Sequence, residues 1–272
     1  MTHTCSACKD GVEKPMEFSM AFQPIVDVVE RRAYAYEALV RGPRGESAYS
    51  ILSQITDETL YAFDQTCRVT AITLASRLKL QETDARLSIN FLPGAVYSPE
   101  ACIQLTLLTA HQFQFPLSRL IFEITESERV TDVAHLQSIA DSYKKHGFSV
   151  AIDDFGAEYA NLNLLTNLSA DVLKLDMELT RNLHLRPRAQ AIVAMMVNFC
   201  AAQNIDLIAE GVETVEEYTV LLRLGIRLMQ GYLLAKPAFE ALPEFTIPEP
   251  VTLQAPAAIV VPSPLPILSS AA

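Results

Sequence analysis

The sequence predicts an α/β fold, in the form of a (β/α)8 barrel whose first strand runs antiparallel to its neighbours. From Phe18 onward, short runs rich in Val, Ile, Leu and Phe alternate with longer amphipathic segments. Continuously apolar strands separated by helices indicate a parallel sheet covered on both faces, and eight such runs suit a barrel of about 250 residues. Only residues 27–32 separate the first two runs. A parallel crossover needs about a dozen residues, so these two strands should pair antiparallel.

The elements follow from apolar periodicity. The expected strands are 20–26, 33–41, 87–92, 120–125, 149–154, 172–176, 206–210 and 228–233. Segments with apolar residues three and four positions apart are expected helices, namely 59–80, 132–146, 187–203 and 214–224. Within 187–203 we expect the core-facing stripe to be Ile192, Met195, Met196 and Phe199. A doubly wound open sheet is the alternative, but no G-x-G-x-x-G motif follows a strand.

Composition excludes several classes of protein. The chain has 272 residues, 21 Lys and Arg, 32 Asp and Glu, and a formal net charge of −11. Half of the residues are hydrophobic, which excludes a disordered acidic protein. The acidic balance argues against binding to DNA or RNA polymers, which requires a surplus of Lys and Arg. It leaves open a small anionic ligand at a site made positive by bound metal.

Three regions are expected along the chain: a flexible leader at 1–17, one domain at 18–245, and a disordered tail rich in Pro and Ala at 246–272. The leader has no apolar run, so it is not a secretory signal. Residues 250–272 carry no charge but contain five prolines, which exclude a membrane-spanning helix. We therefore expect a cytoplasmic protein with reduced cysteines and no contact with the membrane.

Polar and ionisable residues stand late in these apolar strands, where an unpaired charge would be costly. Any one of them could be a paired core residue. In a parallel barrel, however, the carboxyl ends of the strands meet at one face, where active sites lie. The residues are Glu37, Asn90, Glu123, Asp153, Asp154, Lys174, Glu210 and Gln230.

Five carboxylates cannot share one opening unless cations neutralise them. Oxygen ligands suit Mg²⁺ or Mn²⁺, and two ions about 3.5–4 Å apart would stabilise the attacking and leaving oxygens of a phosphoryl displacement. Lys174 would then orient the attacking water, and Glu210 would be a base or a ligand. The residues alone thus indicate a metal-dependent phosphoester hydrolase.

An ordered series of motifs resembles the EAL-domain cyclic di-GMP phosphodiesterases. The resemblance covers roughly residues 18–242, and order and spacing agree throughout. The motifs are Gln23-Pro24-Ile25, Glu37-Ala38-Leu39 with Arg41, Asn90 in SINFLP, Glu123-Ile124-Thr125-Glu126, Asp153-Asp154-Phe155-Gly156, Lys174-Leu175-Asp176, Glu210-Gly211-Val212-Glu213, Gln230-Gly231-Tyr232 and Lys236-Pro237.

The resemblance implies a TIM-like barrel that hydrolyses cyclic di-GMP to linear pGpG with two Mg²⁺ or Mn²⁺ ions, and it implies a homodimer. It assigns Glu37, Asn90, Glu123 and Asp153 to the first metal. It assigns Asp153 and Asp154 to the second, with Glu210 close by or ligating. Lys174 would position the nucleophilic water. The implied contacts with the dinucleotide are Gln23, Leu39, Arg41, Gln230 and Pro237, and the implied loop supports are Glu126 and Glu213.

One departure from the family pattern affects the loop after the fifth strand. Glu158 stands where the family has Gly, and a positive φ there would cost about 1 kcal/mol or more. We expect activity to persist. Outside the domain, Cys5 and Cys8 form half of a zinc site or a redox pair, beside the simpler interpretation that they have no role.

Two further hypotheses on function stand beside the enzyme. The first is a receptor that binds cyclic di-GMP without hydrolysing it, and receptors of this kind in the family usually lose metal ligands. The second is a protein-interaction regulator that no longer binds the nucleotide. Retention of the metal ligands argues against the first, and retention of Gln23, Arg41 and Gln230 argues against the second.

Overall fold

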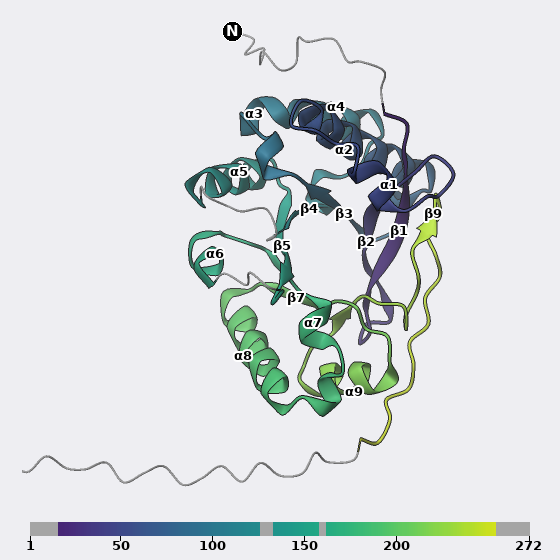
Figure 1. Ribbon diagram of the computed structural model, residues 1–272, viewed down its shortest axis with the longest axis vertical. Helices are drawn as coiled ribbons and strands as arrows, with labels where there is room; N and C mark the ends of the chain where they lie inside the picture. Colours follow the sequence, from purple (N-terminus) through teal and green to yellow (C-terminus); the bar gives the residue numbers. More distant parts are fainter. Residues whose placement is uncertain (1–15, 126–132, 158–161, 254–272) are drawn as a thin grey trace, which may run out of the picture.

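Eight strands close into a barrel, and a ninth short strand joins its outside edge (Figure 1). The computed structural model describes residues 16–125, 133–157 and 162–253. The strands are β1 (Ser19–Asp27), β2 (Arg32–Arg41), β3 (Arg86–Phe91), β4 (Leu120–Thr125), β5 (Ser149–Phe155), β6 (Val172–Leu175), β7 (Asp206–Ala209), β8 (Leu228–Met229) and β9 (Ala238–Phe239).

The pairing of the strands confirms the predicted barrel with its antiparallel first strand. β2 to β8 pair in sequence order, and every neighbour among them is parallel. β1 pairs antiparallel with β2, in a register that places Gln23 opposite Glu37. β1 also pairs antiparallel with β8 and so closes the barrel.

In Figure 1 the helices lie above, to the left of and below the strands, and β9 lies on the right. The helices are α1 (Ala48–Leu52), α2 (Leu60–Arg77), α3 (Pro99–Cys102), α4 (Gln104–Gln112), α5 (Val133–Lys145), α6 (Leu162–Asn167), α7 (Met177–Thr180), α8 (Pro187–Gln203) and α9 (Val215–Arg223). Short 3-10 helices lie at Leu80–Glu82, Pro93–Ala95, Leu117–Arg119 and Leu183–Leu185. The described helices contain no segment long and apolar enough to cross a membrane.

Local chemistry explains where the helices begin and end. α9 starts with a capping box, in which the Thr214 hydroxyl accepts from the Glu217 amide and the Glu217 side chain reaches back. α8 has Pro187 in its first turn, where no amide hydrogen is needed, and ends at Asn204 with a φ of +56°. These signals are visible in the sequence, and α8 has the predicted bounds.

The buried face of α8 differs from the prediction. The residues that face the core are Ala189, Val193, Met196 and Cys200. The side chains of Ile192 and Met195 are 45% and 57% exposed, so the expected stripe was wrong at those two positions. The helix is apolar on more than one side, and periodicity alone therefore does not select the face that packs.

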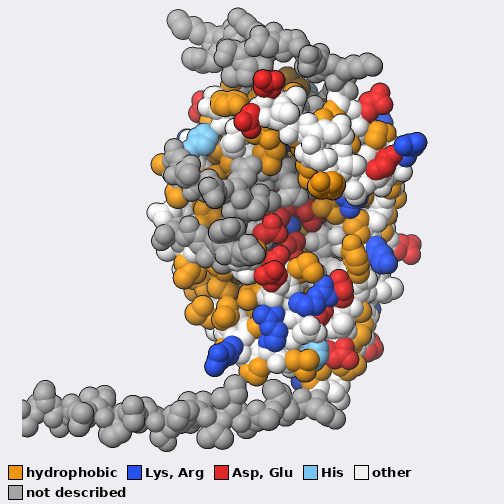
Figure 2. All heavy atoms as spheres, viewed as in Figure 1, with side chains coloured by type: hydrophobic (Ala, Val, Ile, Leu, Met, Phe, Trp, Pro, Cys, Tyr) orange, Lys and Arg blue, Asp and Glu red, His pale blue; other side chains and the backbone are white. Residues whose placement is uncertain are grey.

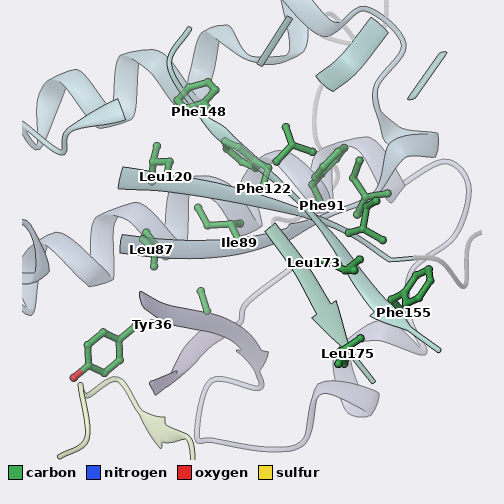
Figure 3. Packing of buried hydrophobic residues seen from close by; sticks show 14 of the residues in the cluster. Tyr36, Leu87, Ile89, Phe91, Leu120, Phe122, Phe148, Phe155, Leu173 and Leu175 are labelled. Atoms are coloured by element: carbon green, nitrogen blue, oxygen red, sulfur yellow. The ribbon is translucent and has the colours of Figure 1, made fainter. Parts of the chain in front are cut away.

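The barrel interior is filled by an apolar layer. Apart from Tyr34, each member lies two residues from a polar residue of the predicted site, which stands on the same strand or directly after it and faces the same way. The members are Ile25, Tyr34, Ala35, Ile121, Ala151, Val172, Ile208 and Leu228. The larger apolar cluster packs the outward faces of the strands against the helices, and Figure 3 shows Phe91, Phe122 and Phe148 in it.

The eighth strand is shorter than the predicted 228–233. Only Leu228 and Met229 are in ladder pairing, after which the chain turns and pairs with the loop that follows β7. The Gln230 carbonyl accepts from the Val212 amide at 3.1 Å, and the Leu233 amide donates to the Val212 carbonyl at 3.1 Å. The glycine between them, Gly231, lies against this loop, so the sequence Gln-Gly-Tyr marks a close approach between loops and not a strand.

Replacing Gly231 with alanine is expected to destabilise the fold strongly. A Cβ atom there would lie 2.0 Å from the Val212 carbonyl oxygen and 2.3 Å from its amide nitrogen, and backbone atoms cannot move aside cheaply. We expect a loss of about 3 kcal/mol in unfolding free energy, or roughly 10 °C in Tm. Thermal unfolding measures this. Gly147→Ala is the comparison: its φ of +88° brings backbone strain of about 1 kcal/mol, but no heavy atom lies within 4 Å of its Cβ position, so it lacks the clash. A smaller loss at Gly231 than at Gly147 would contradict the prediction.

The segment after β9 lies along the barrel. The Tyr36 hydroxyl donates to the Pro243 carbonyl at 3.4 Å, the Thr246 amide to the Leu234 carbonyl at 3.0 Å, and the Val251 amide to the Thr219 hydroxyl at 3.1 Å. The first part of the expected tail, residues 246–253, thus contacts the barrel. Residues 254–272 and the expected leader up to residue 15 lie outside the described residues.

Candidate active site

The predicted polar residues meet at the carboxyl ends of the parallel strands. Glu37, Glu123, Asp153 and Lys174 come from β2, β4, β5 and β6 and are 1–6% exposed. Glu210 and Gln230 directly follow β7 and β8. Parallel register places Asn90 of β3 beside Glu123. Figure 2 shows acidic side chains gathered near the middle of this face, with Lys and Arg side chains below them.

Lys174 lies at the centre of the cluster. Its Nζ is 2.8 Å from Glu210 Oε1, 2.9 Å from Glu123 Oε2 and 3.0 Å from Asp153 Oδ1. It is also 3.6 Å from Glu37 Oε2. One ammonium group therefore faces four carboxylates, a set that bears a net negative charge.

Neighbouring amides and a hydroxyl fix the orientation of the carboxylates. Asn90 Nδ2 and Gln230 Nε2 each donate to Glu37 at 2.9 Å, one to each oxygen. The Ser88 hydroxyl donates to Glu123 Oε1 at 2.5 Å. Sequence reasoning missed Ser88, although it lies two residues before Asn90 and so on the same face of the strand.

Burial and mutual repulsion shift the pKa values in this cluster. Burial, together with the neighbouring carboxylates, raises the pKa of Glu123 and of Glu210 well above the usual range. Burial would also raise the pKa of Glu37, but the Lys174 ammonium and the two amide donors hold it below its usual value. Burial alone would lower the pKa of Lys174, yet the carboxylates raise it, so the ammonium stays charged.

Adjacent aspartates both belong to the site because the backbone of β5 is irregular there. The pairing with β6 shifts register between Ile152 and Phe155, and Asp154 has a φ of +55°. In a regular strand the two side chains would point to opposite faces. The Asp154 amide donates to Asp153 Oδ1 at 2.9 Å. Burial, then the charge of Asp153, raises the pKa of Asp154 to about 6.

Two groups of three carboxylates have oxygen atoms within 4.8 Å of one another. One group is Glu37, Glu123 and Asp153, and the other is Asp153, Asp154 and Glu210. Asp153 belongs to both. Oxygen-only sets of this kind suit hard divalent ions such as Mg²⁺ or Mn²⁺. The described residues therefore fit the two metal positions that the sequence predicts, with the amide of Asn90 beside the first.

The predicted ligand-binding residues line the same end of the barrel. Gln23 lies opposite Glu37, and its Nε2 donates to the Ala235 carbonyl at 3.2 Å. Leu39 and Arg41 end β2, and the Arg41 guanidinium donates to the Val40 carbonyl at 2.7 Å. Pro237 immediately precedes β9, which pairs with β1.

The two predicted loop supports are Glu213 and Glu126. Glu213 lies outside the carboxylate cluster, and both of its oxygens pair with Arg181, at 2.7 and 2.9 Å. Thr180 adds a second contact to the same loop, because its hydroxyl donates to the Glu210 carbonyl at 2.6 Å. Glu126 lies outside the described residues, and so do Glu158, Cys5 and Cys8.

Comparison with known sequences identifies close similarity to one family. The profile of the EAL domain matches residues 9–237. BluF of Escherichia coli, a blue light- and temperature-regulated antirepressor, is 34% identical over 229 residues, which are 84% of this chain and 56% of BluF. The cyclic di-GMP phosphodiesterase PdeF of Escherichia coli is 36% identical over 152 residues, 56% of this chain and 20% of PdeF. The chain thus spans about half or less of the length of these relatives.

Solved structures give the same result. A standalone versatile EAL protein from Vibrio cholerae O395, in its c-di-GMP bound form, is 47% identical with a TM-score of 0.82. The match covers 86% of this chain and 98% of that one. BlrP1 of Klebsiella pneumoniae, in a complex with manganese and cyclic di-GMP, is 35% identical with a TM-score of 0.78, over 84% of this chain and 58% of BlrP1.

Proposed function

The chain belongs to the EAL domain family, and from this premise we propose that it is a metal-dependent phosphodiesterase that hydrolyses cyclic di-GMP to linear pGpG. The proposed catalytic domain is residues 18–245. The observation that supports the proposal most strongly is the pair of carboxylate groups that share Asp153, with Lys174 among them.

In this proposal Glu37, Asn90, Glu123 and Asp153 hold one divalent ion. Asp153 and Asp154 hold the other, with Glu210 beside it. When bound, Mg²⁺ or Mn²⁺ ions supply two effects: they make a water molecule more acidic and they neutralise charge that develops on the phosphate. The Asn90 amide now donates to Glu37 through its Nδ2. To act as a ligand, it would have to present its Oδ1 to the ion.

Lys174 and Glu210 are the proposed catalytic residues. Ion pairs on several sides fix the position of the Lys174 ammonium group, and in this proposal the group orients the attacking water. Glu210 is 14% exposed, which is more than Glu123 or Lys174. A partly exposed carboxylate beside Lys174 is suited to accept the proton of that water.

The proposed contacts with the dinucleotide are Gln23, Leu39, Arg41, Gln230 and Pro237. Arg41 is partly exposed at the end of β2, where its planar, permanently charged guanidinium suits a phosphate. The two glutamine side chains are buried beside Glu37, so they would present amide groups at the base of the ligand site. The homodimer and a role for Cys5 and Cys8 stay predictions.

A second candidate function is a regulator that binds the nucleotide or a partner without hydrolysis. The observation that favours it is the 34% identity to BluF, whose name describes an antirepressor. The two candidates differ in whether the dinucleotide is cleaved.

The deciding experiment is incubation of the protein with cyclic di-GMP and Mg²⁺ or Mn²⁺, with chromatographic detection of pGpG. We expect turnover that EDTA stops and that Glu37→Ala abolishes. Glu30→Ala is the matched control, because Glu30 is exposed in the turn between β1 and β2, at the opposite end of β2 from Glu37. Binding of cyclic di-GMP without any pGpG would favour the regulator and contradict the enzyme.

A further inference from the structure

A charged group is buried on the outer side of the barrel, behind β3 and β4. Asp64 and Arg68 of α2 are 2% and 0% exposed, and Arg68 Nη2 lies 2.7 Å from Asp64 Oδ2. Arg68 Nη1 donates to the hydroxyl of Tyr143, on α5, at 2.6 Å. The group therefore ties α2 to α5 across the backs of two strands, and none of its members belongs to the site described above.

Aromatic rings enclose the guanidinium of Arg68. Its Cζ lies 5.3 Å from the ring centroids of Phe91 and Phe122, and 5.6 Å from that of Tyr143. The rings of Phe91 and Phe122 also contact one another edge-on, at 6.1 Å between centroids (Figure 3). Cation–π attraction and the ion pair together hold each ring in place.

These two rings are the immediate chain neighbours of two proposed metal ligands. Phe91 follows Asn90 on β3, and Phe122 precedes Glu123 on β4. Because successive side chains of a strand point to opposite faces, fixing a ring on the outside fixes the ligand on the inside. Asp64 adds a direct restraint, since its Oδ1 accepts from the Leu92 amide at 3.0 Å, where β3 ends.

Stability alone does not explain why this ion pair is buried here. Replacing a buried ion pair with apolar residues of similar volume is often neutral or stabilising, because removing two charges from water is costly. Arg68 Nε, moreover, has no hydrogen-bond partner in the described part of the chain. What the pair does supply is a fixed geometry. The salt bridge, the hydrogen bond to Tyr143 and the hydrogen bond from Leu92 allow few other arrangements of these side chains.

We propose that Asp64 and Arg68 are positioning residues for the metal site, acting through Phe91, Phe122 and Leu92 on Asn90 and Glu123. The inference rests on the proposed function, because it assigns a task to residues that lie behind the proposed metal ligands. Residues that hold metal ligands in place commonly change metal affinity about 10–100-fold when mutated.

The test is Mn²⁺ binding to the full chain by titration calorimetry, at a temperature well below Tm. Arg68→Lys retains the charge but loses the planar fork, and Tyr143→Phe removes a single hydroxyl. Two controls break interactions of the same two kinds at the opposite end of the barrel. Arg227→Lys weakens the 2.7 Å pair between a half-exposed arginine and the fully buried Asp27. Tyr34→Phe removes a 2.7 Å bond from its hydroxyl to Asp206.

We expect Arg68→Lys to bind Mn²⁺ about 10-fold more weakly than the wild type, with a smaller loss in Tyr143→Phe. The Mn²⁺ affinity of both controls should stay within about twofold of the wild type, even if their Tm falls as far as that of Arg68→Lys. Unchanged affinity in Arg68→Lys, or equal weakening in the controls, overturns the positioning role. If Arg68→Lys does not fold, Tyr143→Phe decides by the same comparison. A wild-type protein that binds no Mn²⁺ contradicts the proposed function instead.

Discussion

An Asp153→Asn protein is expected to lose phosphodiesterase activity by about 1000-fold or more, which corresponds to about 4 kcal/mol of transition-state stabilisation. Asp153 is the only residue common to the two described carboxylate groups, so its charge would serve both proposed ions. The amide has nearly the same shape but no negative charge. The substitution should therefore weaken the binding of both ions, and titration calorimetry should show a lower Mn²⁺ affinity at each position.

Asp171→Asn is the matched control for this substitution. Asp171 accepts from the Val150 amide at 2.9 Å and pairs with Lys144, just before β6 begins at the other end of the barrel. It makes the same types of interaction away from the carboxylate cluster. We expect its activity to stay within a few-fold of the wild type. Two Mn²⁺ ions bound with unchanged affinity in Asp153→Asn would refute the assignment of Asp153 as the shared ligand.

A Lys174→Met protein is expected to be much less stable than the wild type when metal is absent. Removing the ammonium leaves Glu123, Asp153 and Glu210 facing one another without a buried cation, and breaking such a set costs about 3–5 kcal/mol. For a chain of this size that loss lowers Tm by roughly 10 °C. Mn²⁺ should restore much of the Tm, because it supplies positive charge among the same oxygens, while activity should stay lost.

The pH dependence of this effect has a definite sign. The pKa values of Glu123 and Glu210 are raised in the folded protein, so the folded state binds protons more tightly than the unfolded state does. Acidification protonates these groups and relieves their repulsion, whereas stability falls as the pH rises above the unfolded pKa. The Lys174→Met deficit measured with EDTA should therefore be larger at pH 8 than at pH 5.5.

Lys144→Met is the control for the loss of a lysine. Lys144 is 31% exposed and pairs with Asp171 at 2.9 Å on the outside of the barrel. Exposed pairs contribute about 0–1 kcal/mol, so the Tm should change little and Mn²⁺ should have no special effect on it. A Lys174→Met protein as stable as Lys144→Met in EDTA would show that the ammonium is not needed to balance the carboxylates.

The barrel could be predicted because its signals are local. The short link at 27–32 excluded a parallel crossover, and β1 is indeed antiparallel to β2. The end of the eighth strand could not be predicted, because it is set by the contact between Gly231 and Val212. These residues belong to two loops that only the closed fold brings together. The prediction of which face of α8 packs against the core failed for a similar reason. Ile192 and Val193 are equally apolar, and the choice between them is made by what packs beside the helix.

The site was predictable to the extent that each residue broke a local pattern. A carboxylate late in an apolar strand, such as Glu37 or Glu123, is conspicuous on its own. Ser88 and Thr180 break no pattern, because small hydroxyl residues are ordinary in strands and helices. Their roles depend on partners far away in the sequence, such as the bond from Ser88 to Glu123. Arg68 on α2 is unremarkable until the fold shows that it is fully buried.

The antiparallel start of the barrel has a consequence for the order of folding. Gln23 and Glu37 face one another across the β1–β2 hairpin. Bringing them together closes only a short loop, so this part of the site can form early. The bond from Gln230 to Glu37 instead joins residues 193 positions apart, and it requires β8 to reach β1. We therefore expect the pairing of β8 with β1 to form late, because it closes a long loop. A divalent ion that binds only the completed cluster would draw the folding equilibrium toward the closed barrel.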